Sequence, residues 1–156
     1  MDAIDRKIVV ALQQDGSAGL AELSKVAGLS VSATAERVKR LEERRVIRGW
    51  RADLDPVAVG CPLLAFVFVA TRGGTKEEAA FRKAMRREEA VLECHQVSGV
   101  WTHLLKLRLA DLGALEAFMA GLRGQSAVDR TEVLIALATT KETSVLPVAP
   151  PPPEEE

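Results

Sequence analysis

Apolar residues recur at helical spacing in the first part of the chain. Ile4, Ile8 and Leu12 repeat every four positions, which predicts an amphipathic helix that ends near Asp15. A second, shorter helix is predicted over residues 20–27, because its leucine, valine and alanine residues share one face. Both helices are therefore expected to bury one side in a common core.

A third helix is predicted after a turn at Gly28. Ser30 is a suitable N-cap, and an apolar stripe runs from Thr34 to Leu41 on one side of the segment. A short helix, a turn that contains glycine and a longer helix is the order of a helix-turn-helix unit. In such units the second helix of the pair lies in the major groove of DNA.

The segment after the third helix alternates apolar and polar residues. Val46–Leu54 places Trp50, Ala52 and Leu54 on one face, which predicts a strand and hence a winged variant of the unit. Asp55-Pro56 then breaks regular structure. We therefore assign residues 1–54 to a winged helix-turn-helix domain and residues 55–61 to a linker.

The second half of the chain carries strand and helix patterns in turn. Leu63–Thr71 is a nearly continuous apolar run, which predicts a buried central strand. The other predicted elements are strands at 91–97, 101–109 and 132–138, and helices capped by Thr75 and Asp111. This βαββαβ order is that of the ferredoxin-like fold. The predicted fold class is α+β, with the second domain over residues 62–140.

The strands of this second domain carry apolar residues on both faces. Its two helices can cover one face of a four-stranded antiparallel sheet, so the other face needs a different cover. A second copy of the chain is the simplest cover, which predicts a homodimer. Residues 141–156, rich in proline and glutamate, show no periodicity and are predicted to form a disordered tail.

Charge is distributed unevenly between the two halves. Residues 1–52 carry ten basic and seven acidic residues, a net charge of +3, whereas residues 53–156 carry eleven and fifteen, a net charge of −4. A basic unit on an acidic body is what phosphate binding by one half requires. A charge-rich helix face that only meets solvent is the alternative interpretation.

The third helix concentrates this basic charge on the side opposite its apolar stripe. Small residues at its start would let it approach base edges closely, and arginines behind them would reach guanine or phosphate groups. The candidate DNA-contacting residues are Ser30, Ser32, Ala33, Glu36, Arg37, Lys39, Arg40, Arg44, Arg48 and Arg51.

Several motifs of the chain match one known family when they are taken together. They are Asp5-Arg6-Lys7-Ile8, Leu23-Ser24-Lys25-Val26-Ala27-Gly28-Leu29-Ser30, Arg37-Val38-Lys39-Arg40-Leu41-Glu42, Val46-Ile47, and Leu54-Asp55-Pro56 with Gly60. With the βαββαβ order, these motifs resemble the Lrp/AsnC (feast/famine) transcription regulators over about residues 2–146.

The resemblance implies a cytoplasmic, nucleoid-associated regulator that binds double-stranded DNA. It implies a RAM/ACT-like second domain, a homodimer that pairs through its sheets, and often an octamer built as a tetramer of dimers. Dimers of this kind bind pseudo-palindromic DNA sites, because two recognition helices are related by a two-fold axis. The family's usual effectors are amino acids or related small molecules.

The resemblance also implies an effector pocket at the loop after the second strand of the C-terminal domain. The loop residues are Gly99, Val100, Trp101, Thr102 and His103. Family members usually carry acidic residues here, whereas this loop has no carboxylate to meet an α-ammonium group. An apolar or aromatic effector, or none, is therefore expected. His103 is either a sensor that titrates near neutral pH or a packed interface residue beside Trp101.

A second departure from the family lies at the end of the third helix. The family usually has glycine there, and this chain has Arg45. A non-glycine residue in a left-handed helix cap costs roughly 1 kcal/mol. A further phosphate contact is the expected gain.

Other classes of function find less support in the sequence. Some haem-biosynthesis decarboxylases resemble this fold and use His and Tyr clusters, but this chain has no Tyr and only His95 and His103. We therefore expect no enzymatic activity. A ligand-sensing or interaction module of the same fold, without DNA binding, is the alternative.

No metal, cofactor or membrane span is predicted. Cys94 and His95 are adjacent in a strand and should point to opposite faces, so they cannot jointly hold a metal ion. Two cysteines, Cys61 and Cys94, cannot form a disulfide framework, and reduced thiols are expected in a cytosolic protein. The longest apolar run, residues 63–70, is far shorter than the roughly 18 residues that a membrane helix needs.

Overall fold

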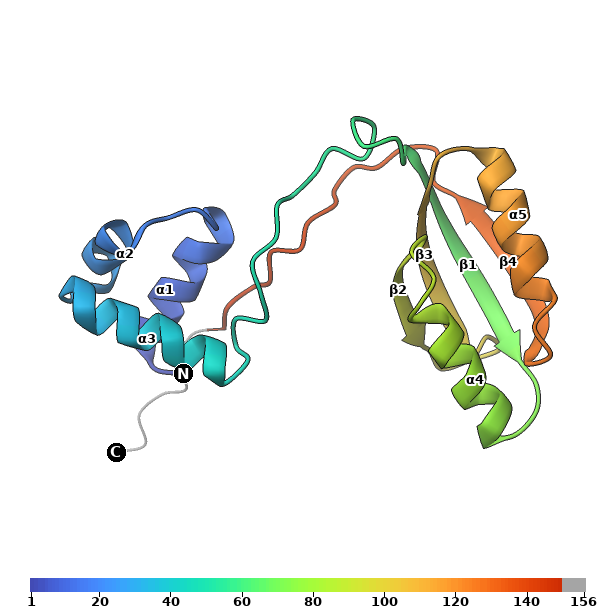
Figure 1. Ribbon diagram of the computed structural model, residues 1–156, viewed down its shortest axis with the longest axis horizontal. Helices are drawn as coiled ribbons and strands as arrows, with labels where there is room; N and C mark the ends of the chain where they lie inside the picture. The colour runs from blue at the N-terminus through green and yellow to red at the C-terminus, as the bar shows by residue number, and fades with distance from the viewer. Residues whose placement is uncertain (150–156) are drawn as a thin grey trace. The chain divides into compact units, whose positions relative to one another are not determined.

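The computed structural model describes residues 1–149 of the chain. The chain divides into two compact units (Figure 1). Among the described residues, the first contains Met1–Asp53 together with residues 141–149, and the second contains Leu54–Thr140. Each unit has its own hydrophobic core.

Three helices build the first unit: α1 (Ala3–Gln14), α2 (Leu20–Ala27) and α3 (Val31–Glu43). Their shared core contains Ile8, Leu12, Leu23 and Leu41, each at most 9% exposed. The predicted stripe of α3 is only partly buried, because Thr34 and Leu41 are enclosed whereas Val38 is half-exposed. The helix-turn-helix arrangement is confirmed (Figure 1).

Capping interactions explain where α1 and α3 begin and where α3 ends. Asp2 accepts a hydrogen bond from the Asp5 N–H at 2.8 Å, which caps α1, and Ser30 caps α3 through the Ala33 N–H. Arg45, with φ of 55°, ends α3 in the left-handed region. The Val46 N–H then donates to the Leu41 carbonyl at 2.9 Å, which closes a Schellman motif.

The predicted wing strand is wrong. Residues 46–54 form no strand, and the Val46 and Ile47 N–H groups turn back onto the Leu41 carbonyl. Trp50 and Leu54, which the alternation placed on one buried face, are 48% and 62% exposed. Because these side chains do not pack into a hydrophobic core, no burial fixes the register of a strand over this segment.

The second unit has the predicted βαββαβ order. Its elements are β1 (Leu63–Thr71), α4 (Thr75–Met85), β2 (Val91–Gln96), β3 (His103–Leu109), α5 (Leu112–Arg123) and β4 (Val128–Ile135). The strands form one antiparallel sheet in the order β2-β3-β1-β4. The predicted α+β ferredoxin-like domain is confirmed (Figure 1).

Several element boundaries in this unit differ from the predictions; β3 begins at His103 rather than residue 101, and β4 ends at Ile135 rather than residue 138. The N-cap of α4 is Gly74, not Thr75, and the Glu77 carboxylate accepts the Gly74 N–H at 2.9 Å. The last strand begins at Val128 rather than Glu132, because Val128 is buried and already pairs with Thr71. The apolar residues near the end of the strand led the sequence prediction to begin it four residues too late.

The two faces of the sheet have different surroundings. Val67, Val69, Leu105 and Leu107 are fully buried on one face, under helix residues such as Phe81 and Met119 of α4 and α5. On the other face Phe66, Phe68 and Leu104 are half-buried, and Leu134 is 49% exposed. Within one chain, apolar side chains of this second face therefore remain open to solvent.

The linker and tail regions also take definite conformations. Residues 56–60 form a turn in which the Val59 N–H donates to the Asp55 carbonyl at 3.1 Å. Within the predicted disordered tail, Leu146 and Ala149 hydrogen-bond to side chains of helix α1. The rest of that tail, residues 150–156, lies outside the described residues.

Candidate nucleic-acid interface and effector loop

The N-terminal end of α3 is small and exposed. Ser30 accepts the Ala33 N–H at 3.2 Å, and its hydroxyl lies 3.1 Å from the Ser32 hydroxyl. All three side chains are exposed. Because a helix N-terminus carries partial positive charge, small residues there allow close approach to a phosphate or a base edge.

Two exposed cations of α3, Lys39 and Arg40, form surface ion pairs within the helix. Arg40 Nε lies 3.2 Å from Glu36 Oε1, and Lys39 Nζ lies 3.8 Å from Glu43 Oε1; these two cationic side chains are 66% and 67% exposed. Exposed pairs of this kind contribute about 0–1 kcal/mol, so they exchange readily for phosphate contacts. We call the exposed residues Ser30, Ser32, Ala33, Glu36, Lys39, Arg40 and Arg44 the recognition face.

Two further predicted residues follow α3. The indole N–H of Trp50 donates to Glu42 Oε1 at 2.8 Å, which ties the segment that carries Arg48 and Arg51 to the C-terminal part of α3. Both arginines are exposed. The basic surface therefore continues beyond the helix, although no wing strand supports it.

Arg37 is placed differently from the other predicted residues. Its Nη1 lies 2.6 Å from Asp2 Oδ2 and 2.7 Å from Asp5 Oδ1, and its side chain is 29% exposed. Hydrogen bonds to these carboxylates raise the pKa of Arg37. The hydrogen bond from the Asp5 backbone N–H lowers the pKa of Asp2, and the hydrogen bond from Arg37 lowers it further. In this structure Arg37 joins α3 to the start of α1.

The sequence prediction did not identify Asp2 and Asp5 as partners of Arg37. The available signal was their spacing, because two acids three residues apart in a first helical turn lie on one side. They also cap α1 by exchanging side-chain and backbone hydrogen bonds. The same two carboxylates thus serve the cap and the arginine.

The predicted effector loop exposes only part of its residues. Gly99 has φ of 113°, and Val100 beyond it is 73% exposed. The Trp101 ring lies 5.9 Å from the Phe68 ring, and the Arg130 guanidinium lies 4.6 Å from its centroid. Val100 and Trp101 therefore form an apolar surface with a cation beside it.

Thr102 and His103 belong to the interior under this loop. The Thr102 hydroxyl donates to the Val69 carbonyl at 3.0 Å and accepts the Thr71 N–H at 2.9 Å. His103 is 1% exposed, and its ring lies 4.8 Å from that of Phe81. The five predicted effector residues are therefore split between a surface and a buried polar network.

His103 has a charged neighbour as well as apolar ones. Its Nε2 lies 3.0 Å from Glu78 Oε1, within ion-pairing distance but without the angle of a hydrogen bond. Burial lowers the pKa of His103, and the Glu78 carboxylate opposes that effect. His103 therefore packs against Phe81 of α4 within one chain, and its place at a subunit interface stays a prediction.

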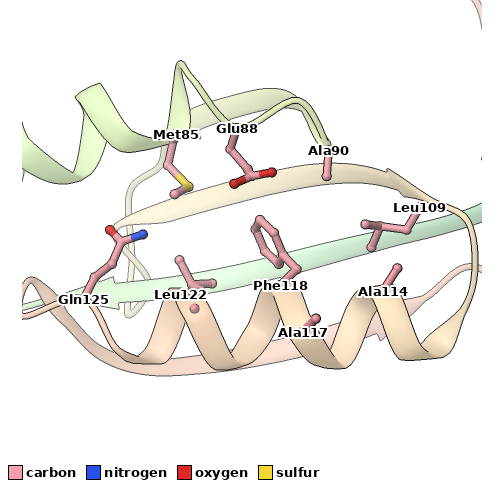
Figure 2. A pocket seen from close by; sticks show the side chains of 10 residues that line it. Met85, Glu88, Ala90, Leu109, Ala114, Ala117, Phe118, Leu122 and Gln125 are labelled. Atoms are coloured by element: carbon pink, nitrogen blue, oxygen red, sulfur yellow. The ribbon is translucent and has the colours of Figure 1, made fainter.

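A cavity lies elsewhere in the second unit, between α5 and the end of α4. Its volume is about 470 Å³ (Figure 2). The lining residues are Met85, Glu88, Ala90, Leu109, Ala114, Ala117, Phe118, Gly121, Leu122 and Gln125. None belongs to the loop 99–103, and the sequence prediction did not find this cavity.

The described residues contain neither a metal-type cluster nor a membrane-type helix. Within residues 1–149, no three His, Cys, Asp or Glu side chains are grouped so that they could hold a metal ion. Cys94 pairs with Leu105 and His95 with Leu104, so the two side chains lie on opposite faces of the sheet, as predicted. No helix in the same range is long and apolar enough to cross a bilayer.

A helix-turn-helix unit with an exposed basic helix, joined to a ferredoxin-like domain, defines a two-domain DNA-binding regulator. Two family models match the chain: the AsnC-type helix-turn-helix domain over residues 1–42 and the Lrp/AsnC ligand binding domain over residues 64–146. The chain belongs to the Lrp/AsnC family of transcription regulators, which confirms the resemblance found in its sequence motifs.

Named relatives agree with this assignment. The chain is 35% identical to the HTH-type transcriptional regulator FL11 of Pyrococcus abyssi, over 95% of this chain and 97% of the relative. It is 38% identical to the leucine-responsive regulatory protein of Haemophilus influenzae, over 94% and 89%.

A solved structure shows the same fold. A transcriptional regulator of Neisseria meningitidis, solved as a complex with L-methionine, is 30% identical with a TM-score of 0.89, over 94% of this chain and 96% of that one. The similarity extends over nearly the whole length of both chains.

Proposed function

We propose that the recognition face of α3 enters the major groove of a specific double-stranded operator. Ser32 and Ala33, at the start of the helix, approach the base edges most closely, and Arg40, about two turns further along, reaches guanine edges or phosphates. Lys39, Arg44, Arg48 and Arg51 contact the phosphate backbone, which positions the unit. The single observation that carries this proposal is the exposure of this cationic face on the second helix of the motif.

Charge in this region supports the proposal. Residues 36–51 contain seven basic and three acidic residues, a net charge of +4. Neutralising several phosphates per subunit releases counterions, so affinity is expected to fall steeply as salt rises. Arg37 acts here mainly as a positioning residue, since two carboxylates already hold its guanidinium.

The regulator acts as a homodimer in this proposal. Phe66, Phe68 and Leu104 lie half-buried on the open face of the sheet, with Leu134 more exposed. Packing this face against the same face of a second copy would bury apolar surface that water now contacts. A two-fold dimer presents two α3 helices to two half-sites, and four dimers would give an octamer.

A small effector is expected to act through the second unit. The Neisseria meningitidis neighbour was solved with L-methionine, and Val100 and Trp101 offer an apolar surface beside Arg130 here. An amino-acid-like ligand with an apolar side chain and a carboxylate fits this combination. The regulator would act in the cytoplasm, on nucleoid DNA.

Capture and sequencing of the DNA fragments that the full chain retains tests this function. Enrichment of a pseudo-palindromic sequence from its own promoter region is the expected result. Retention of no preferred sequence at any salt concentration would instead favour the alternative, an interaction module without DNA binding.

A further inference from the structure

The C-terminal segment of the chain packs against the first helix of the DNA-binding unit. From its contacts we infer that residues 141–149 are a clasp: an extended peptide that docks on α1 and helps to hold the recognition helix in its binding position. The docking surface is the side of α1 that carries Arg6 and Gln13. The effect on DNA affinity rests on the function proposed above.

The side-chain amide of Gln13 both donates a hydrogen bond to the backbone of this segment and accepts one from it. Its Nε2 donates to the Leu146 carbonyl at 3.0 Å, and its Oε1 accepts the Leu146 N–H at 2.7 Å. A side-chain amide thus pairs with one residue as a neighbouring β-strand would. This double contact requires residue 146 to be extended and correctly oriented.

Two other contacts fix the end of the segment. The Arg6 guanidinium donates to the Ala149 carbonyl, and Arg6 lies about two turns from Gln13 on the same side of α1. Val148 packs against the hydrophobic core that Ile8, Leu12 and Leu23 form. The clasp therefore combines backbone recognition at two positions with apolar burial between them.

The sequence of the clasp suits this role. Pro147 follows Leu146, and a residue before proline is restricted to extended conformations. The segment is therefore partly preorganised, which lowers the entropy that docking must remove. A segment that the sequence alone suggests as disordered is thus compatible with a docked extended peptide.

The clasp and the recognition helix α3 both contact helix α1. Arg37 of α3 is ion-paired to Asp2 and Asp5 at the start of α1, and the clasp binds Arg6 and Gln13 along the same helix. The clasp also continues the chain directly from the end of the second unit at Thr140.

Two pairs of full-length variants test the clasp. Gln13→Ala removes both hydrogen bonds to Leu146, whereas Gln14→Ala changes the exposed neighbouring glutamine as a control. Leu146→Pro removes the N–H donor, whereas Leu146→Ala keeps it and alters a side chain that is 65% exposed. Hydrogen exchange of residues 141–149 and of α1, measured without DNA, reports whether the clasp is docked. Titration with operator DNA measures the binding affinity.

In Gln13→Ala the exchange of the Leu146 amide should rise about fivefold, the effect of one lost hydrogen bond. Leu146→Pro should raise exchange in α1. Both variants should lose about threefold to tenfold in operator affinity, and both controls should behave as the parent. Unchanged exchange in Gln13→Ala would overturn the docking. Normal affinity with raised exchange would overturn the coupling, and an absence of DNA binding by the parent would refute the proposed function alone.

Discussion

The Arg37 guanidinium of α3 and the Asp5 carboxylate of α1 form an ion pair 2.7 Å long, in which the Asp5 side chain is only 13% exposed. Asp5 also belongs to the cap of α1. The recognition helix is therefore attached to the first helix by charge as well as by the apolar core.

Removing this arginine should affect stability and DNA binding together. Arg37→Ala leaves the enclosed Asp5 carboxylate without its cation, so the first unit should melt at lower temperature and bind operator DNA more weakly. Arg40→Ala removes an exposed arginine and should weaken DNA binding alone. Thermal unfolding and DNA titration of both variants check this; equal melting temperatures for Arg37→Ala and the parent would contradict the positioning role.

The left-handed residue at the end of α3 offers a stabilising substitution. Arg45 has φ of 55°, where glycine is free of the side-chain clash, so Arg45→Gly should raise the free energy of unfolding by about 1 kcal/mol. Arg44→Gly is the matched control, since Arg44 has φ of −79° and should lose stability instead. Denaturant unfolding distinguishes the two, and a destabilised Arg45→Gly would show that the side chain has a structural contact.

The sequence predicted most of the helix-turn-helix and of the βαββαβ domain, because periodicity reports burial directly. It failed where the outcome depended on particular partners. Trp50 and Leu54 alternate like a strand but have no core behind them. The ion pairs of Arg37 with Asp2 and Asp5 were not predicted, whereas DNA contact by Arg37 stays a prediction.

The tail shows the same limit. The absence of apolar periodicity is a correct sign that residues 141–149 form no helix or sheet strand. It does not show whether a partner surface exists, and here the side-chain amide of Gln13 provides one.

The buried histidine should make the second unit sensitive to acid. Burial lowers the pKa of His103 below its ordinary value of 6.5, so the unfolded chain takes up a proton at a higher pH than the folded chain. The contribution to stability is complete above about pH 6.5 and is lost as the pH falls through the folded-state pKa.

Thermal unfolding across this pH range, on the parent and two variants, checks the assignment. His95→Gln removes the exposed histidine and should keep the acid sensitivity, whereas His103→Gln should flatten it. If His95→Gln flattened the profile instead, the assignment to His103 would be wrong.

The open sheet face should support dimer formation. Leu134→Asp places a charge on this face and should shift the protein toward monomer, because an unpaired carboxylate is costly in an apolar interface. Leu137→Asp, at a side chain that is 97% exposed just beyond β4, is the control and should leave the assembly unchanged. Light scattering after size-exclusion chromatography measures both, and an intact dimer in Leu134→Asp would place the interface elsewhere.

Salt dependence of operator binding, measured for the parent, Arg40→Glu and Arg87→Glu, tests the recognition face most directly. Both substitutions reverse one exposed arginine, but Arg40 lies on α3 and Arg87 lies in the second unit. The parent's affinity should fall steeply with salt, Arg40→Glu should lose at least about tenfold in affinity with a shallower salt slope, and Arg87→Glu should match the parent. Equal losses in the two variants, or none in Arg40→Glu, would contradict DNA recognition by α3.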